Sequence, residues 1–252
     1  MRLKNKTAII TGGGAGIGRA IAERFGREGA SVVIAEIDAA SGNSAERSIR
    51  DSGGEALFLQ TDVSDEAQVK AMVEKALDRC GRIDVLCNNA AVLLFREEAR
   101  AHELTNHAWD RTIAVNLRGY WLCSKYVIPV MLRQGSGSII YVASPTGLFG
   151  FTRLTAYSAS KGGVVGLMRA MAADYAPDNI RVNAIVPGTI DTPMNAVELS
   201  DPEVRKHFAD IAPARRLGTP EDLAGIAVYL ASEESSYCVG GIFTVDGGLT
   251  AV

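Results

Sequence analysis

Read from residue 11, the sequence runs Thr11-Gly12-Gly13-Gly14-Ala15-Gly16-Ile17-Gly18, and this stretch decides the fold of the 252-residue chain. It follows an apolar run and leads into a helix-like pattern at 16–29. A helix N-terminus binds phosphate because its first N–H groups are unpaired, and glycines let the backbone approach a pyrophosphate. A mononucleotide phosphate loop needs Gly-Lys-Ser/Thr, whereas Arg19 and Ala20 follow here. The loop therefore favours a dinucleotide, with a glycine-rich turn that binds no ligand as the alternative.

Strand-like and helix-like segments alternate along the chain. Short apolar, β-branched runs predict strands at 7–11, 31–36, 55–60, 83–87, 137–143, 180–186 and 242–246. Helical patterns fill the gaps near 16–29, 40–52, 65–80, 103–133, 155–176, 202–211 and 221–232. Most of the strands are apolar nearly throughout, which is typical of strands buried on both faces of a parallel sheet. We therefore expect an α/β fold: a doubly wound parallel seven-stranded sheet (Rossmann type) with helices on both faces.

No proline-rich or charged linker divides the chain, so we expect a single domain over 1–252. The segment 189–215 is long and contains several prolines, and we expect it to form a lid over a substrate. Thr219-Pro220-Glu221-Asp222 has the pattern of a helix start, with a Thr cap, a proline in the first turn and two acids at the positive end.

The composition excludes several classes of protein. Apolar residues make up 47% of the chain, which argues against disorder. The formal charge of −3 gives no general attraction to nucleic acid or to anionic membranes. No run approaches the ~18 apolar residues of a membrane span. The first strand follows directly after residues 1–6, which leaves no room for a signal peptide, so we expect a cytoplasmic protein without a membrane or nucleic-acid partner.

Neither the cysteines nor the histidines form a recognisable ligand set. No Cys-x-x-Cys pair occurs, and a disulfide framework is unusual in a cytosolic chain of this size, so buried free thiols are expected. The histidines show no metal spacing with each other or with a cysteine, so no metal site is expected. The residues concerned are Cys80, Cys87, Cys123, Cys238, His102, His107 and His207.

An acidic residue ends the second predicted strand, about 20 residues beyond the glycine loop. Glu36 can accept hydrogen bonds from the adenosine ribose hydroxyls and would repel a 2′-phosphate. No Arg or Lys stands at Gly14, Ala15 or Ile37 to attract such a phosphate. This favours NAD over NADP as the cofactor. The alternative is that Glu36 is a solvated strand end and that Asp38 merely begins the next helix.

The middle of the chain holds a second pattern. Tyr157 and Lys161 are four residues apart in a helical stretch and therefore share one helix face. Ser144 ends the strand before this helix, and Asn116 lies in the helix before that strand. Each feature alone is common on protein surfaces. Together with the glycine loop they resemble the short-chain dehydrogenase/reductase family, in its Tyr-x-x-x-Lys branch, over essentially the whole chain.

Further pieces match the family, and two positions depart from its usual pattern. The matching pieces are Asp62-Val63, Asn88-Asn89-Ala90, Pro187-Gly188, Thr192 and Asp246-Gly247-Gly248. The usual Asn-Asn-Ala-Gly ends here in Ala91, and the usual Ser-Ser pair is Ala143-Ser144. The position that matches the catalytic serine is thus retained.

The resemblance implies a role for each matching residue. The implied catalytic residues are Asn116, Ser144, Tyr157 and Lys161. The implied cofactor-binding residues are Gly12, Gly14, Gly16, Ile17, Gly18, Glu36, Asp62, Val63, Asn88, Ala90, Tyr157, Lys161, Pro187, Gly188, Ile190 and Thr192. Asp62 and Val63 would flank the adenine, Asn88 would line the cofactor cleft, and Thr192 would face the nicotinamide amide.

The implied chemistry is the oxidation of an alcohol. Tyr157 as a phenolate can take the hydroxyl proton, although a free phenol has a pKa of ~10. A Lys161 ammonium about 4 Å away contributes ~4 kcal/mol at an effective dielectric of ~20, which would lower the pKa of Tyr157 toward the working pH. Ser144 can bond the substrate oxygen, and Asn116 can hold a water that links Lys161 to solvent.

The substrate end is less specific. Contacts are expected from loops beyond the strand ends, and the candidates in these loops are Arg96, Thr146, Arg153 and Met194. We expect an NAD-dependent oxidoreductase of a small secondary alcohol or ketone, such as a sugar, polyol, hydroxy acid or cyclic diol. The alternatives are an NADPH-dependent ketoacyl reductase and a non-catalytic dinucleotide-sensing protein. The resemblance, with apolar residues in excess along 103–133 and 155–176, also predicts a homotetramer.

Overall fold

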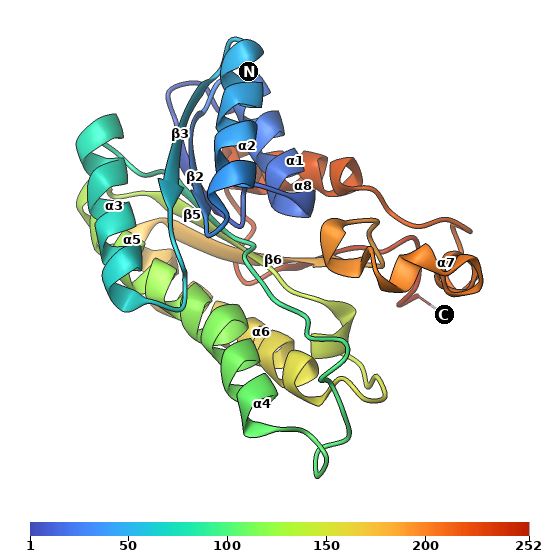
Figure 1. Ribbon diagram of the computed structural model, residues 1–252. Helices are drawn as coiled ribbons and strands as arrows, with labels where there is room; N and C mark the ends of the chain where they lie inside the picture. Colours follow the sequence, from blue (N-terminus) through green and yellow to red (C-terminus); the bar gives the residue numbers. More distant parts are fainter. Residues whose placement is uncertain (252) are drawn as a thin grey trace.

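The computed structural model describes residues 1–251 and contains one seven-stranded sheet (Figure 1). The strands are β1 Thr7–Thr11, β2 Ser31–Glu36, β3 Glu55–Gln60, β4 Val85–Asn88, β5 Gly137–Val142, β6 Ile180–Pro187 and β7 Ile242–Val245. Their order is β3-β2-β1-β4-β5-β6-β7, and every neighbouring pair is parallel. The order reverses at β1, between β2 and β4. In open α/β sheets, ligands bind beyond the strand ends at such a switch point.

Helices cover both faces of the sheet (Figure 1). They are α1 Gly16–Arg27, α2 Ala39–Asp51, α3 Glu66–Cys80, α4 Asn106–Ile113, α5 Gly119–Gln134, α6 Thr155–Tyr175, α7 Pro202–Asp210 and α8 Pro220–Ala231. One apolar cluster joins the sheet to α1, α2 and α8, and a second joins its other face to α3, α5 and α6. Across residues 1–251, none of the helices has the length and apolar character needed to cross a membrane.

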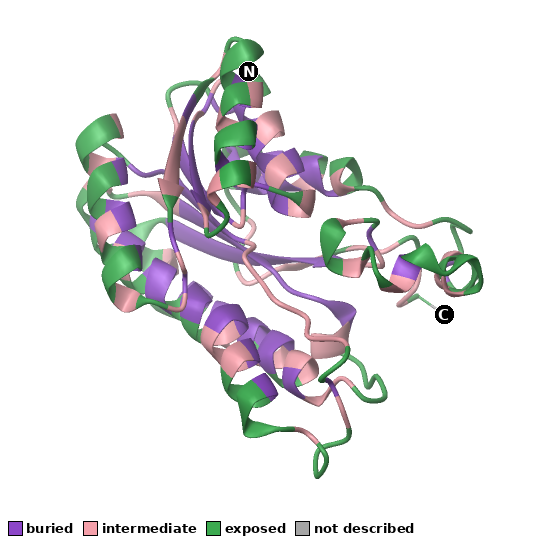
Figure 2. Ribbon diagram, in the orientation of Figure 1, coloured by how far each residue is buried: buried purple, intermediate pink, exposed green. Residues whose placement is uncertain are grey.

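Burial follows the sequence pattern of continuous apolar strands. All residues of β1 and β6 are buried, whereas the edge strands β3 and β7 are only partly covered (Figure 2). A strand that is covered by helices on both faces needs apolar side chains at every position, because neither face of the sheet is exposed to water. The predicted parallel sheet and its two helical layers are therefore confirmed.

The predicted start of α8 is also confirmed. Thr219 and Asp222 form a reciprocal capping box, in which the Thr219 N–H donates to Asp222 Oδ2 at 2.8 Å. Pro220 lies in the first turn of the helix, where the N–H group that proline lacks would have no partner within the helix. This local signal was readable because every participant lies within four residues.

The helix expected near 103–133 forms over 106–134, with a π-helical turn inside it. The chain forms α4, a π-helical turn over Ala114–Arg118, and then α5. α4 begins only after Thr105, whose hydroxyl accepts a hydrogen bond from the Ala108 N–H at 3.1 Å. A π-helical turn inserts one residue into a helix and frequently marks a functional site. Here it carries Asn116.

The fourth strand begins at Val85 rather than at residue 83. Asp84, the residue before it, is buried, and its carboxylate accepts a hydrogen bond from the Thr7 N–H at 2.9 Å. The Arg82 guanidinium donates to the same carboxylate. The backbone of Asp84 also bonds to both neighbouring strands, because its N–H donates to the Thr7 carbonyl oxygen at 2.8 Å and its carbonyl oxygen accepts from the Ser138 N–H at 2.9 Å.

All four cysteines are free, as expected. Cys87 and Cys123 are fully buried, and burial raises the pKa of each thiol to about 12. Cys80 and Cys238 are only partly buried, so the expectation of burial holds for two of the four.

The apolar residues that suggested an oligomer lie mostly inside the chain. Side chains of α5 and α6 that are buried against the sheet are Leu122, Val130, Met131, Val164, Met168 and Met171. Trp121 is 40% exposed, and Tyr126 and Leu167 are partly buried. The apolar excess along these helices is therefore largely explained by the chain's own core, and the homotetramer stays a prediction that rests on the resemblance.

Candidate active site

The glycine loop turns sharply between β1 and α1. Gly12 and Gly16 have φ angles of +63° and +53°, a backbone region that side chains disfavour. Gly18 lies against the loop itself, because a Cβ at this position would stand 2.1 Å from the Gly12 carbonyl oxygen. The Asn89 side-chain amide donates to the carbonyl oxygens of Thr11 and Gly12 at 3.0 and 3.2 Å, which fixes the loop. Gly12, Gly16 and Gly18 are thus positions at which the geometry of the loop favours glycine.

Gly18→Ala is expected to destabilise the protein by about 1–3 kcal/mol, because the added methyl group must displace backbone. NAD affinity should fall with it, since the loop would move. Gly166→Ala is the matched control, because Gly166 lies in α6 with no atom near its would-be Cβ. That control should be neutral or stabilising by about 0.5–1 kcal/mol. Urea unfolding and fluorescence titration with NAD measure both effects, and equal stability of the two variants would contradict the close fit.

A cavity of about 240 Å³ runs from the glycine loop along the ends of β2 and β4. Its lining includes Gly12, Gly16, Ile17, Glu36, Asp62, Val63, Asn89, Ala90 and Thr192. Half of the residues that the resemblance implied for cofactor binding are therefore brought together in this cavity. The close-fitting glycines, the acid at the end of β2 and the apolar wall at Val63 suit a pyrophosphate, a ribose and an adenine.

Glu36 is held in a fixed position at one side of this cavity. Its Oε2 accepts a hydrogen bond from the Gly14 N–H at 3.1 Å. Its Oε1 accepts from the N–H groups of Ile37 and Asp38 at 2.8 and 3.2 Å. The Gly14 N–H therefore faces a carboxylate, and Glu36 is an ordered side chain rather than a freely solvated strand end.

Asp62 is oriented by partners that the sequence did not single out. Burial opposes its charge, but hydrogen bonds from Ser64 and the nearby Arg111 guanidinium hold the pKa of Asp62 below its usual value. The Ser64 hydroxyl donates to Asp62 Oδ1 at 2.6 Å, and Arg111 Nη1 lies 3.7 Å from Oδ2. Arg111 also lines the cavity. It belongs to α4, far from Asp62 in sequence, so no local pattern could have indicated it.

Asn88, which the resemblance implied for the cofactor cleft, does not line the cavity at the glycine loop. Asn88 is the last residue of β4 and is fully buried, and its side-chain amide donates to Ser124 Oγ in α5 at 3.3 Å. The next residue, Asn89, lines the cavity instead. Successive side chains of a strand point to opposite faces, so a shift of one residue moves the side chain from the cleft to the core.

Ser144, Tyr157 and Lys161 meet where β5 ends and α6 begins. Ser144 follows β5, and its Oγ accepts a hydrogen bond from the Thr146 hydroxyl at 3.0 Å. Lys161 Nζ lies 5.6 Å from the centre of the Tyr157 ring. It donates to the Val142 carbonyl oxygen at 2.8 Å and to the hydroxyl of Tyr120 at 3.4 Å. Tyr120, fully buried in α5, was missed because an apolar helix pattern gives no sign of its hydroxyl contact.

Burial dominates the electrostatics of this group. It lowers the pKa of Lys161 to about 7. It also raises the pKa of Tyr157 to about 12, although a hydrogen bond with Ser144 acts in the opposite direction. Burial therefore acts against the lowering of the Tyr157 pKa that the spacing of Tyr157 and Lys161 predicts.

Asn116 joins the catalytic helix to the loop after β4. Its Oδ1 accepts from the Val92 N–H at 2.8 Å, and its amide donates to the Val92 carbonyl at 2.9 Å and to Ser160 Oγ at 3.2 Å. The Ser160 hydroxyl in turn donates to the Tyr157 carbonyl oxygen at 2.8 Å. The side chain of Asn116 is therefore engaged in protein contacts that position α6.

A larger cavity of about 420 Å³ opens beside Tyr157 and Ser144. Its apolar wall includes Leu93, Phe95, Pro145, Phe151, Leu154, Leu199, Phe208 and Leu249. Its polar residues include Glu98, Thr146, Thr152, Arg153, Thr189, Asn195 and Glu198. Of the four substrate candidates, Thr146 and Arg153 line this cavity. Met194 lines the glycine-loop cavity instead, and Arg96 is exposed and lines neither cavity.

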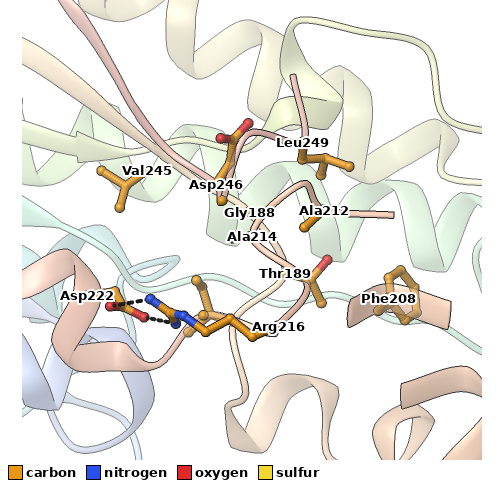
Figure 3. A pocket seen from close by; sticks show the side chains of 13 residues that line it. Gly188, Thr189, Phe208, Ala212, Ala214, Arg216, Asp222, Val245, Asp246 and Leu249 are labelled. Carbon is orange, nitrogen blue, oxygen red and sulfur yellow. Dashed lines mark hydrogen bonds and ion pairs between the residues drawn. The ribbon is translucent and has the colours of Figure 1, made fainter. Parts of the chain in front are cut away.

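A smaller cavity of about 120 Å³ adjoins this one (Figure 3). Thr189, Phe208 and Leu249 line both, as does Gly188. Gly188 and Ile190, implied as cofactor contacts, thus line the small cavity rather than the one at the glycine loop. Pro187 ends β6 inside the core. Arg216 and Asp222 also line the small cavity, and they form a two-point ion pair with each other (Figure 3).

Comparison with known proteins gives consistent matches over the whole chain. A family model described as enoyl-(acyl carrier protein) reductase matches residues 12–250. An uncharacterized oxidoreductase of Bacillus subtilis, YxbG, is 46% identical over 99% of this chain and 93% of its own length. Cis-4-hydroxycyclohexanecarboxylate dehydrogenase of Sinomonas cyclohexanicum is 41% identical, covering 98% and 97%.

A solved structure extends this similarity to three dimensions. It is a putative NAD(P)-dependent gluconate 5-dehydrogenase from Beutenbergia cavernae with bound NADP at low occupancy. It superposes with a TM-score of 0.93 at 38% identity, covering 99% of this chain and 98% of that one. The chain is therefore similar in sequence and fold to oxidoreductases along its entire length.

Proposed function

The chain belongs to the short-chain dehydrogenase/reductase family, and on this premise we propose that it is an NAD-dependent dehydrogenase of secondary alcohols that carry an apolar ring or chain. As a member of this family it is an oxidoreductase that acts on a secondary alcohol or ketone with a nicotinamide dinucleotide. The choice of NAD, the roles of individual residues and the substrate class are the proposal.

One observation carries the proposal. Tyr157 and Ser144 are next to each other in the wall of the 420 Å³ cavity, while Lys161 stands behind Tyr157 on the same helix face. A phenol that opens onto a substrate-sized cavity, beside a second hydroxyl and a buried amine, is suited to moving a proton to or from an alcohol oxygen.

Each member of this group has one task. Tyr157 takes the hydroxyl proton of the alcohol. Ser144, oriented by Thr146, donates a hydrogen bond to the substrate oxygen as it becomes a carbonyl. Lys161 supplies positive charge behind Tyr157, and Asn116 holds α6 in place through Ser160. Bound NAD supplies the hydride acceptor.

The residues along the glycine-loop cavity would hold the cofactor. The glycines would receive the pyrophosphate, Asp62 and Val63 would flank the adenine, and Thr192 would lie at the nicotinamide end. The fixed carboxylate of Glu36 supports NAD, because it would accept hydrogen bonds from ribose hydroxyls and repel a 2′-phosphate. The gluconate 5-dehydrogenase neighbour contains bound NADP, so the preference of this chain for NAD over NADP is tested by kinetics with both cofactors.

The lining of the larger cavity supports an apolar substrate. Aromatic and aliphatic side chains form most of its wall, and Glu98 is already bonded to the protein. Arg153 is the cation of the cavity, and it lies 3.8 Å from the Glu103 carboxylate. The segment 189–215 contributes Asn195, Leu199 and Phe208 to the wall, as expected of a lid. Such a lining favours cyclic alcohols over sugars and open-chain polyols.

A substrate panel tests the function directly. Cyclohexanols, cyclohexanediols, hydroxycyclohexanecarboxylates, gluconate, polyols and 2-hydroxy acids are offered with NAD, and NADH absorbance is followed. We expect the highest kcat/KM with cyclic secondary alcohols. Oxidation of NADPH by a 3-oxoacyl thioester at higher efficiency would favour the ketoacyl-reductase alternative. Cofactor binding without turnover on any substrate would favour a sensing protein.

A further inference from the structure

Glu98 is a buried acid outside the predicted catalytic group. It lies in the loop between β4 and α4, is 7% exposed, and faces the larger cavity. A buried carboxylate is costly unless hydrogen bonds or a counter-charge compensate for its lost hydration. The buried carboxylate of Glu98 therefore needs specific hydrogen-bond partners.

Both oxygens of Glu98 find these partners in the first turn of α6. Oε1 accepts from the Tyr157 N–H at 2.7 Å, and Oε2 accepts from the Ala156 N–H at 3.2 Å. These are N–H groups that a local cap usually satisfies. The helix has no such cap, because Leu154 at the N-cap position offers no side-chain acceptor. Glu98 supplies the cap from 58 residues away.

A second contact joins the same two segments. The Thr155 hydroxyl donates to the carbonyl oxygen of Ala99 at 2.7 Å. The loop that holds Glu98 also contributes Leu93 and Phe95 to the cavity wall. The loop and the helix turn that carries Tyr157 are therefore joined by hydrogen bonds at both Glu98 and Ala99.

We propose that Glu98 is a positioning residue for Tyr157: its carboxylate fixes the first turn of α6 and couples the substrate loop to the acid–base group. This inference rests on the proposed function, since it assigns a task relative to Tyr157. Misplacement of a reacting group by about 1 Å lowers the rate on the order of 10²-fold. Loss of the cap at this turn would therefore lower turnover by shifting Tyr157.

Glu98 also sets part of the charge around Tyr157. The ionisable groups that face Tyr157 are Lys161 on its own helix, Tyr120 from α5 and Glu98 from the loop. Burial contributes most to the raised pKa of Tyr157, and the negative charge of Glu98 raises it further. Removal of that charge should therefore lower the pKa of Tyr157 and move the alkaline rise of alcohol oxidation to lower pH.

Glu98→Gln tests both parts, because the amide keeps the shape but loses the charge and one acceptor. We expect kcat to fall about 10-fold or more while the KM for NAD stays unchanged. The rising limb of the pH profile should shift down by roughly half a unit or more. Glu97→Gln is the matched control, since Glu97 is the exposed neighbour, and it should leave both readouts unchanged. A wild-type pH profile in Glu98→Gln would overturn the proposal.

Glu98→Asp keeps the inference testable if the glutamine variant does not fold. The aspartate retains the charge but is one methylene too short to reach both N–H groups. We expect kcat to fall with the pH profile in its original place, because position is disturbed and charge is not. An aspartate variant with the kcat of the wild type would contradict the positioning role.

Amide hydrogen exchange separates this inference from the proposed function. Exchange at Ala156 and Tyr157 should be about 10-fold faster in Glu98→Gln than in Glu97→Gln, with no substrate present. Equal exchange in the two variants would overturn the role of Glu98 even in an active enzyme. If exchange is faster in Glu98→Gln but the protein oxidises no alcohol, the capping role of Glu98 stands and only the proposed function is overturned.

Discussion

Replacing Tyr157 by phenylalanine is expected to lower the turnover of alcohol oxidation by about 10²–10⁴-fold, the loss typical of a missing general base. The substitution removes one oxygen and keeps the ring. The backbone contacts of this turn, to Glu98 and to Ser160, do not involve the hydroxyl and should persist. Initial rates of NADH formation, measured with the best substrate of the panel, give the effect.

The control for this variant is cofactor binding. Tyr157→Phe should bind NAD with nearly the affinity of the wild type, because the glycine loop and Glu36 are untouched. The two measurements together separate a lost proton acceptor from a damaged cleft. A Tyr157→Phe protein that turns over at the wild-type rate would show that another group takes the proton, and the assignment of Ser144, Lys161 and Asn116 would fall with it.

The pH dependence of oxidation follows from the direction of the pKa shifts. Tyr157 must lose its proton before it can accept one, and burial raises its pKa to about 12. The rate of oxidation should therefore increase with pH through neutrality and into the alkaline range. The reverse reaction, in which Tyr157 donates a proton, should not need this ionisation and should be favoured at lower pH. The buried Lys161, with its pKa lowered to about 7, adds positive charge most effectively below neutrality.

The fold could be predicted from the sequence because its signals are local. A strand such as β2 is apolar from Val32 to Ala35, a pattern that can be read from neighbouring residues alone. The positive φ angles at Gly12 and Gly16 explain why the loop between β1 and α1 is visible as a run of glycines. The π-helical turn at Ala114–Arg118 could not be predicted, because the apolar pattern continues through it. Asn116 in this turn bonds to Val92, which lies in a distant loop.

The site could be predicted only where its residues sit close together in sequence. Tyr157 and Lys161 share a helix face, so their spacing alone brings them together. Glu98 could not be recognised, because a glutamate in a polar loop is usually solvated and its partners lie 58 residues away. The same holds for Arg111, whose contact with Asp62 exists only once α4 packs beside the end of β3.

The pKa of Tyr157 shows a second limit of sequence reasoning. The four-residue spacing gives the proximity of Lys161, and proximity alone predicts a lowered pKa. Burial is a property of the whole fold, however, and it acts on both groups at once. In the structure burial raises the pKa of Tyr157 and lowers that of Lys161, and Lys161 directs its hydrogen bonds to Val142 and Tyr120.

Cofactor choice provides the second large expected effect. Glu36→Ala combined with Ile37→Arg should reverse the preference, with the ratio of kcat/KM for NAD to that for NADP falling on the order of 100-fold or more. Removal of the carboxylate frees the N–H groups of Gly14, Ile37 and Asp38, which can then donate to a 2′-phosphate. The added guanidinium supplies the charge-assisted partner at a position that is 51% exposed.

The single variants show which part of the change matters. Ile37→Arg alone should gain little with NADP, because the Glu36 carboxylate still repels the phosphate and attracts the new guanidinium to itself. Glu36→Ala alone should lose efficiency with NAD. Asp38→Asn is the control, because it removes the charge of a neighbouring acid that caps α2 through the Ser41 N–H. This variant should change the use of NAD and NADP alike. Equal or better use of NADP by the unmodified protein would remove Glu36 from its assigned role, because a carboxylate fixed by three backbone N–H groups leaves none of them for a phosphate.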